Sequence, residues 1–238
     1  MREMLDIIRE RQSARVLFDP ERPIAKEKLR QILEAARWAP TAHNMQNFEV
    51  VVVDDRTLLT ALSNIKHEVD DAFIRENYQQ LSFSEDELRT KKVGILGAMF
   101  PPSWRRPGLA PIPHEERAHS FLGGPIQKSA VLLFVLYDPG RRAPASEGDF
   151  LGIMSLGCVM ENMWLMAQSL GIGVHILSVL SAESVEREVK PLLGIPDRLK
   201  IAFAARLGYP ISSPNYVRVR RDVDDFTHHN RFGRKGLG

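Results

Sequence analysis

Two guanidinium groups and one hydroxyl group lie close together near the N-terminus, in the run Arg11-Gln12-Ser13-Ala-Arg15. A guanidinium group binds phosphate through two parallel hydrogen bonds, and a hydroxyl group adds a further donor. The segment therefore suits a bound phosphate group. By composition alone, the solvated basic end of a helix explains the same residues.

A second polar segment, Pro40-Thr41-Ala42-His43-Asn44-Met45-Gln46, precedes a valine-rich run and contains mostly small and amide residues. Amide side chains offer donors and acceptors together, so Asn44 and Gln46 could bind the polar edge of a heterocycle. An ordinary capping and turn segment has the same composition. Both interpretations stay open on these residues alone.

A third basic segment lies near the C-terminus, at Arg218-Val-Arg220-Arg221, and three aspartates follow it. In an extended chain, residues two apart point to the same side, so Arg218 and Arg220 would face one anion together. Taken alone, the segment is typical of an exposed, charge-balanced tail.

Composition excludes several classes of protein. The chain has 238 residues, 44% of them hydrophobic and 26% charged, which is typical of a globular protein with a substantial core. The formal net charge of +2 does not indicate a nucleic-acid partner. The single cysteine, Cys158, and the absence of an apolar signal segment predict a cytoplasmic protein. Polar residues interrupt the apolar stretch 150–180, which predicts a buried helix and a strand rather than a membrane span.

Hydrophobic periodicity predicts the elements that must position these segments. We expect strands over 48–53, 130–137, 174–180 and 199–207, and helices over 4–11, 29–39, 58–65, 84–92, 152–170 and up to Leu192. Ser84-Glu-Asp-Glu87 has the form of a capping box at the start of one helix, and Ser181 is expected to cap the last. Strands separated by helices of several lengths favour an α+β or α/β fold in a single domain, 1–238. The proline- and glycine-rich stretch 67–124 predicts an excursion over the body of that domain.

Familiar catalytic and metal-binding motifs are absent from the sequence. His114 and His119 are separated by one residue more than a zinc-binding helix requires to place two histidines on one face. Gly171-Ile-Gly173 lacks the third glycine of a dinucleotide-binding fingerprint and is better explained as the end of a helix. The sequence therefore predicts no metal site.

Taken in order, the segments resemble the FMN-dependent nitroreductases. The resemblance rests on Arg-x-Ser-x-Arg, then Ala-Pro-Thr-Ala-His-Asn-x-Gln before a valine-rich strand, and later Leu-Gly-Ile-Gly, Leu-Leu-Gly-Ile-Pro and Leu-Gly-Tyr-Pro. The ending, with Arg218-x-Arg220 and His229-Asn-Arg231-Phe-Gly233, is similar to the family's C-terminal arm. The resemblance covers residues 1–65 and 150–238.

Two positions depart from the family's pattern. Asn47-Phe48 stands where the family often has Pro-Trp. Leu177-Ser178-Val179 stands where the family often has an acidic residue after the start of the third strand. Both changes fall on the flavin or substrate face, so they bear on the identity of the substrate more than on FMN binding.

The resemblance implies a fold, a cofactor and a reaction. The fold would be an α+β sandwich with a mixed central sheet of about four to five strands flanked by helices. FMN would be the cofactor, NADH or NADPH the reductant, and a nitroaromatic compound, a quinone or another small flat molecule the electron acceptor. Transfer would be ping-pong at the flavin N5 with no catalytic side chain. The implied cofactor-binding residues are Arg11, Gln12, Ser13, Arg15, Pro40, Thr41, Ala42, Asn44, Gln46, Leu177, Ser178, Arg218 and Arg220.

The resemblance also implies a homodimer with FMN at the subunit interface. The Pro40–Asn44 loop would come from the neighbouring subunit, and residues 214–238 would wrap the partner as an arm. Arg15 would reach the pyrimidine edge of the ring, and a backbone N–H from 176–178 would contact the ring. The apolar helix 152–170 fits a large interface.

Two other functions stay open, namely a flavin-destroying or reductively dehalogenating relative and a non-catalytic FMN carrier. The excursion 67–124 matches no family motif, and we expect it to form a lid that decides acceptor preference. Its aromatic rings would stack on flat acceptors, although they could equally pin the excursion to the domain. These rings belong to Phe73, Tyr78, Phe83, Phe100 and Trp104.

Overall fold

The computed structural model describes residues 3–68, 76, 80–99, 118–119, 123–213 and 217–237. Residue contacts divide the chain into two compact units. The first, called the sheet unit below, comprises Met1–His67 and Ser120–Pro214, and the second, called the arm unit, comprises Glu68–His119 and Asn215–Gly238. The single domain predicted over 1–238 stays a prediction.

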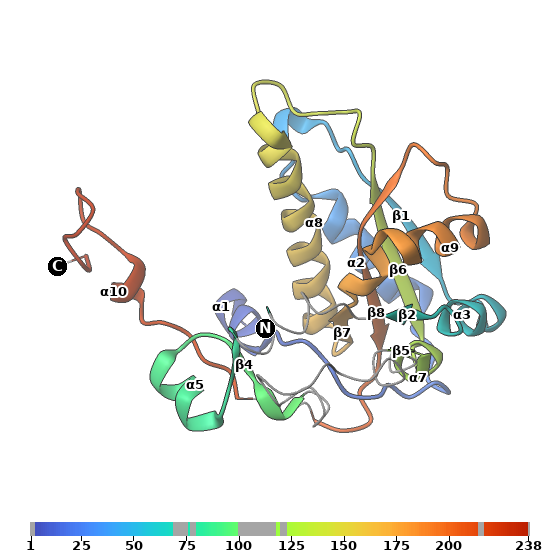
Figure 1. Cartoon of the computed structure of the whole chain (residues 1–238), viewed down its shortest axis with the longest axis horizontal. Coiled ribbons are helices and arrows are strands. Elements are labelled where there is room, and N and C mark those ends of the chain that lie inside the picture. The colour runs from blue at the N-terminus through green and yellow to red at the C-terminus, as the bar shows by residue number, and fades with distance from the viewer. Residues whose placement is uncertain are drawn as a thin grey trace. The chain divides into compact units, whose positions relative to one another are not determined.

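The sheet unit contains the helices and strands that carry most of the candidate residues (Figure 1). Its described helices are α1 (Met4–Glu10), α2 (Lys26–Arg37), α3 (Arg56–Ser63), α7 (Gly123–Gln127), α8 (Phe150–Ser169) and α9 (Glu183–Leu193). Its strands are β1 (Glu49–Val53), β6 (Val131–Tyr137), β7 (Gly173–Ile176) and β8 (Lys200–Gly208). Short 3-10 helices are η1 (Ala42–Asn44), η5 (Glu147–Asp149) and η6 (Ser178–Ser181).

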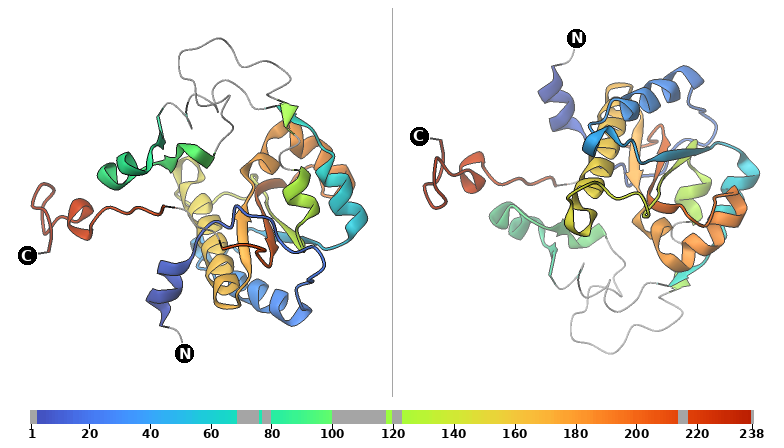
Figure 2. Two further views of the ribbon diagram at one scale, coloured as in Figure 1. Left: turned by 90° about the horizontal axis from the view of Figure 1, so that it is seen from below. Right: turned by 90° about the horizontal axis from the view of Figure 1, so that it is seen from above.

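The strands form one sheet in the order β1-β6-β8-β7, with helices on both faces (Figure 2). Val131 through Leu136 of β6 are all buried, because both faces of this central strand are covered. Successive residues of a strand face opposite sides. Leu133 and Val135 accordingly join the core cluster with α2 and α8, whereas Leu132 and Phe134 join the cluster with α3 and α9.

The predicted α+β fold class is confirmed, but three details of the prediction are wrong. The sheet is not mixed, because each of its ladders is antiparallel. The strand predicted over 174–180 ends at Ile176, because the chain turns into η6, where the N–H of Leu180 donates to the carbonyl of Leu177 at 3.1 Å. Ser181 does not cap α9, since its hydroxyl donates to the carbonyl of Ser178 at 2.7 Å and Ala182 holds the cap position.

The arm unit is built from short elements. They are α5 (Glu85–Lys91), α10 (Val223–Phe226), η3 (Gly97–Met99), β5 (Ala118–His119) and the parallel pair β3 (Ser82–Phe83) and β4 (Ile95–Leu96). The two residues of β2 (His67–Glu68) fall one in each unit. The predicted capping box at α5 is confirmed, because Ser84 Oγ accepts from the N–H of Glu87 and the Glu87 carboxylate accepts from that of Ser84. These bonds to Ser84 lower the pKa of Glu87.

An ion pair within the arm unit joins the excursion to the C-terminal segment. Lys92 Nζ pairs with the carboxylate of Asp222 and lies 3.9 Å from that of Asp225. The hydrogen bond to Asp222 raises the pKa of Lys92. Two of the aspartates that follow Arg218 and Arg220 therefore have a structural role.

The aromatic residues of the predicted lid fall mostly on residues that the structure does not describe. Phe83 is half-buried in β3, and Lys91 Nζ lies 5.1 Å from the centre of its ring. The other four rings lie outside the described residues, as does His114. The lid stays a prediction.

Candidate functional site

The segment that carries Arg11, Ser13 and Arg15 runs along the open edge of the sheet. Ser13 forms a parallel bridge with Val174 of β7, and the N–H of Ala14 donates to the carbonyl of Val174 at 2.8 Å. The segment thus covers part of an edge strand whose backbone groups would otherwise lack partners on that side. Ser13, which is predicted to bind phosphate, is thereby fixed beside β7, and Arg11 and Arg15 lie two residues to either side of it.

Arg11 and Gln12 are anchored on the C-terminal half of α8. The guanidinium group of Arg11 lies 4.6 Å from the centre of the Trp164 ring, and its Nε lies 3.4 Å from a carboxylate oxygen of Glu161. Trp164 Nε1 donates to the carbonyl of Gln12 at 3.3 Å. Because the side chain of Arg11 is 22% exposed, it still reaches solvent at this edge.

Positive charge accumulates where this segment meets β7 and β8. His175 of β7 has its pKa lowered from 6.5 to about 3, first by burial and then by the charges of Arg206 and Arg15. Arg206 Nε donates to His175 Nδ1 at 3.1 Å, so a neutral imidazole carries its proton on Nε2. An anion bound here would meet the positive potential of Arg206 and Arg15. His175 would contribute no charge, because it is neutral.

Arg206 and His175 are functional candidates that sequence reasoning missed. Arg206 is a charged residue in the apolar run Ile201–Leu207 of β8, and it is 1% exposed. A charge within a run predicted as a central strand is unusual, because burying it without partners is costly. An arginine within this apolar run was the sequence signal that could have identified Arg206 as a candidate.

The loop with Asn44 and Gln46 has an unusual backbone. His43, Asn44 and Gln46 have φ of 50°, 52° and 46°, which are left-handed conformations that non-glycine residues seldom adopt. Such conformations are frequent at functional sites. Gln46 Nε2 donates to Asn44 Oδ1 at 3.2 Å, and both side chains are exposed. The two amides therefore lie together at the surface.

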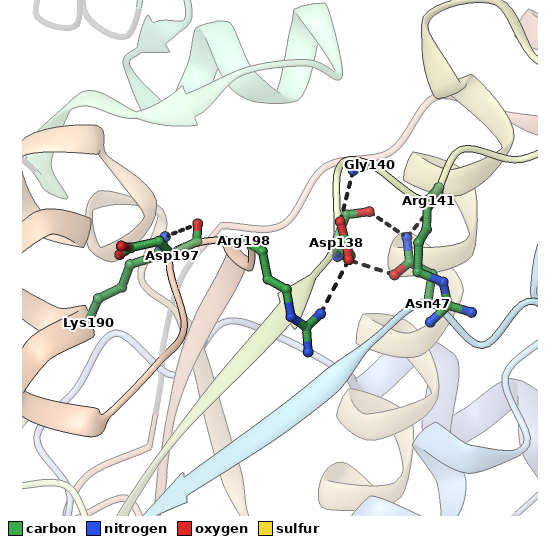
Figure 3. Close-up of polar contacts among 7 residues, drawn as sticks. All are labelled: Asn47, Asp138, Gly140, Arg141, Lys190, Asp197 and Arg198. Carbon is green, nitrogen blue, oxygen red and sulfur yellow. Dashed lines mark hydrogen bonds and ion pairs between the residues drawn. The ribbon is translucent and has the colours of Figure 1, made fainter.

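Asn47, where the sequence departs from the family pattern, anchors this loop to the turn after β6 (Figure 3). Its Nδ2 donates to the carbonyls of Asp138 at 2.9 Å and Arg141 at 3.0 Å, and its Oδ1 accepts from the N–H of Asp138 at 3.2 Å. Arg198 and Gly140 also bind the Asp138 carboxylate, at 3.2 and 2.9 Å. The side-chain amide of Asn47 is thus used to hold the loop against the turn after β6.

The three backbone N–H groups of 176–178, one of which is predicted to contact the flavin ring, differ in their surroundings. The N–H of Leu177 donates to the carbonyl of Ala204 at 2.8 Å, and its side chain is 2% exposed. The N–H of Leu177 is therefore already used within the sheet, and the place of Leu177 among the cofactor-binding residues stays a prediction. Alternate residues of an antiparallel strand face opposite edges, so the N–H of Ile176 points away from β8. Ser178 is exposed at the start of η6, where helical N–H groups lack internal partners.

Within one chain, the two predicted halves of the site lie toward opposite ends of α8 (Figure 1). The N–H of Ala42 donates to Ser155 Oγ at 2.9 Å, near the start of the helix, whereas Gln12 contacts Trp164. The helical rise from Ser155 to Trp164 is about 14 Å. The loop with Pro40, Thr41 and Ala42 is therefore not beside Ser13 in the same chain.

The helix α8 exposes a wide apolar surface. Phe150, Ile153 and Met154 are 65%, 59% and 52% exposed. By length and composition alone, the span Glu147–Ser169 could cross a membrane, and 22% of its apolar window is buried inside the chain. A helix that packs against protein passes the same test, so this is weak evidence for a span. The cytoplasmic location stays a prediction.

The remaining candidate residues belong to the arm unit. Arg220 Nη1 donates to the carbonyl of Val219 at 2.7 Å, and both Arg218 and Arg220 are described as part of that unit. Their contact with the phosphate segment stays a prediction. Across the described ranges, no group of three or more His, Cys, Asp or Glu residues gathers as a metal site would require.

Comparison with known proteins places this architecture in a family. The model of the nitroreductase family matches residues 8–209. A protein of Archaeoglobus fulgidus, whose name marks it as a candidate NADH dehydrogenase/NAD(P)H nitroreductase, is 25% identical over 235 residues, 99% of each chain. An NADPH-dependent oxidoreductase of Staphylococcus aureus is 21% identical over 212 residues, covering 89% of this chain and 67% of its own length.

Solved structures share the fold. A nitroreductase with bound FMN from Bacteroides fragilis has a TM-score of 0.58 and 20% identity, covering 95% of this chain and 98% of its own. An FMN-dependent nitroreductase from Clostridium difficile has a TM-score of 0.58 and 19% identity, covering 96% and 99%. The family match spans most of the sequence, so the chain belongs to the nitroreductase family.

Proposed function

We propose that this chain is an FMN-dependent oxidoreductase that uses NADH or NADPH to reduce nitroaromatic compounds, quinones or related flat acceptors. Membership of the nitroreductase family supports the class of reaction. The names of its relatives support the reductant and the cofactor. The observation that carries the proposal is the basic edge formed by Arg11, Ser13 and Arg15 beside β7.

The donor chemistry of that edge fits the phosphate of FMN. The phosphate carries close to two negative charges, and guanidinium and hydroxyl groups are suitable donors for its oxygens. Burial lowers the pKa of His175 most, and the charges of Arg206 and Arg15 lower it further, which supports a positive potential at this place. In the proposal, Arg218 and Arg220 complete the phosphate site, and Arg15 extends to the pyrimidine edge of the ring.

The ring would be bound by residues from both subunits of a homodimer. The backbone N–H groups of Ile176 and Ser178 are the available donors on the β7 side. The loop 40–46, with Asn44 and Gln46, would come from the neighbouring subunit, because in its own chain it lies toward the other end of α8. The exposed apolar residues of α8 would form the interface, since large exposed apolar patches mark association surfaces.

The protein's own part in the reaction is binding and orientation. Bound FMN would supply the redox chemistry, accepting hydride from the nicotinamide and passing electrons to the acceptor. The basic edge would hold the phosphate, and backbone donors would orient the ring. No protein side chain needs to exchange a proton or form a covalent bond in this scheme.

An anaerobic titration of the purified protein tests the proposal. We expect a yellow flavin spectrum, bleaching of that spectrum by NADH or NADPH, and recovery of the oxidised spectrum on addition of a nitroarene or a quinone. In steady-state assays that vary both substrates, we expect parallel double-reciprocal lines. A flavin that no nicotinamide bleaches would indicate an FMN carrier, and intersecting lines would contradict a single shared site. Reduction without any transfer to these acceptors would instead favour a flavin-destroying or dehalogenating relative.

Sedimentation tests the dimer. We expect the intact chain to sediment as a homodimer that loses both its dimeric state and its flavin when residues 214–238 are deleted. A monomer in the intact protein would refute the composite site.

A further inference from the structure

Arg206 clamps two backbone carbonyl groups of the segment that follows Ser13. Its Nη2 donates to the carbonyl oxygens of Ala14 at 3.0 Å and Val16 at 2.7 Å. Its guanidinium group lies 4.3 Å from the centre of the buried Phe18 ring. These residues are far apart in sequence from Arg206, so the contacts attach the N-terminal segment to strand β8.

The clamp fixes the direction of the neighbouring side chains. Ala14 is held at both backbone groups, because its N–H donates to Val174 and its carbonyl accepts from Arg206. Its side chain is 2% exposed and faces the interior. The N–H of Arg15 donates to the carbonyl of Ser13 at 3.0 Å, which closes a tight turn around Ala14. Arg15 is exposed and Ser13 is half-buried, so both side chains reach the surface at the edge of the sheet.

His175 fixes the orientation of the clamp itself. Arg206 Nε donates to His175 Nδ1, and this bond sets the plane of the guanidinium group. Burial and the charges of Arg206 and Arg15 keep the pKa of His175 near 3, so Nδ1 remains an acceptor at neutral pH. A lysine could not reproduce this planar arrangement.

We propose that Arg206 is a positioning residue for phosphate binding: it holds the backbone of this segment so that Ser13 presents its hydroxyl group to the phosphate of FMN. This inference rests on the proposed function. Arg206 acts through the segment and does not touch the phosphate, and His175 acts as the acceptor that orients it.

The test compares binding of FMN with binding of riboflavin, which has the same ring and lacks the phosphate. Arg206→Lys keeps the charge without the planar fork, and Arg206→Met removes both. We expect each variant to weaken FMN binding about tenfold or more while changing riboflavin binding less than about twofold. Equilibrium dialysis of the full chain measures both dissociation constants. Arg198→Lys, at an exposed arginine that pairs with Asp138, is the matched control and should change neither.

The outcomes separate this inference from the proposed function. If the unmodified protein binds FMN no better than riboflavin, the phosphate assignment itself fails. If it prefers FMN and Arg206→Lys keeps that preference, or weakens both flavins equally, the positioning role is overturned and the proposed function stands. If neither Arg206 variant folds by circular dichroism, His175→Leu decides, because loss of the acceptor should still reduce the preference for FMN, and an unchanged preference overturns the inference.

Discussion

We expect the half-buried imidazole of His175 to make the free energy of unfolding depend on pH, and one substitution isolates its contribution. Its pKa in the folded chain is about 3, against 6.5 for an ordinary histidine. The folded state therefore favours the neutral imidazole. The stability that His175 contributes is fully present above pH 6.5 and is lost as the pH falls toward 3.

The size of the effect follows from the two pKa values. Between pH 6.5 and about 3, the unfolded chain binds one proton more than the folded chain. The free energy of unfolding therefore falls by about 1.4 kcal/mol for each unit by which the pH is lowered. At pH 5 the loss relative to pH 8 is about 2 kcal/mol. Arg206 and Arg15, the charged groups that lower this pKa, stay protonated throughout this range.

Urea unfolding of the unmodified chain and of His175→Asn at several pH values measures this effect. The side-chain oxygen of asparagine can accept the Arg206 hydrogen bond and does not titrate. Other titrating groups contribute equally to both proteins, so the difference between their free energies of unfolding isolates His175. We expect that difference to change by about 2 kcal/mol between pH 8 and pH 5, at one protein and one FMN concentration. A difference that stays constant with pH would refute a lowered pKa of His175 in the folded chain.

Three further predictions concern other parts of the chain. Arg218→Ala should weaken FMN binding by about 1.5–3 kcal/mol, so that flavin is lost on dilution, and an unchanged flavin content would remove Arg218 from the site. Gly208→Ala should lower the melting temperature through overpacking worth about 1–3 kcal/mol, because its Cβ would lie 2.6 Å from a buried phenylalanine ring. Gly124→Ala, which has open space around its Cβ, is the control for that comparison. The double variant Phe100→Ala and Trp104→Ala should change acceptor preference without changing flavin content, and an unchanged preference would refute the lid.

The sequence determined the elements and the faces they bury. The continuous apolar run 130–137 and the spacing of Leu29, Ile32 and Ala36 predicted a central strand and an amphipathic helix, and both are present. The capping box at Ser84 was also predictable from the sequence. These features depend on residues within a few positions of one another, so local patterns are enough to define them.

The sequence also singled out the polar segments of the site, but not their arrangement. Tertiary structure decided that Ser13 lies beside β7, that Leu177 has no free N–H, and that the loop 40–46 lies toward the other end of α8. It also brought Arg206 to the carbonyl of Ala14, across most of the length of the chain. Such contacts depend on how strands and helices pack, and hydrophobic periodicity carries no information about which distant backbone group a buried arginine will meet.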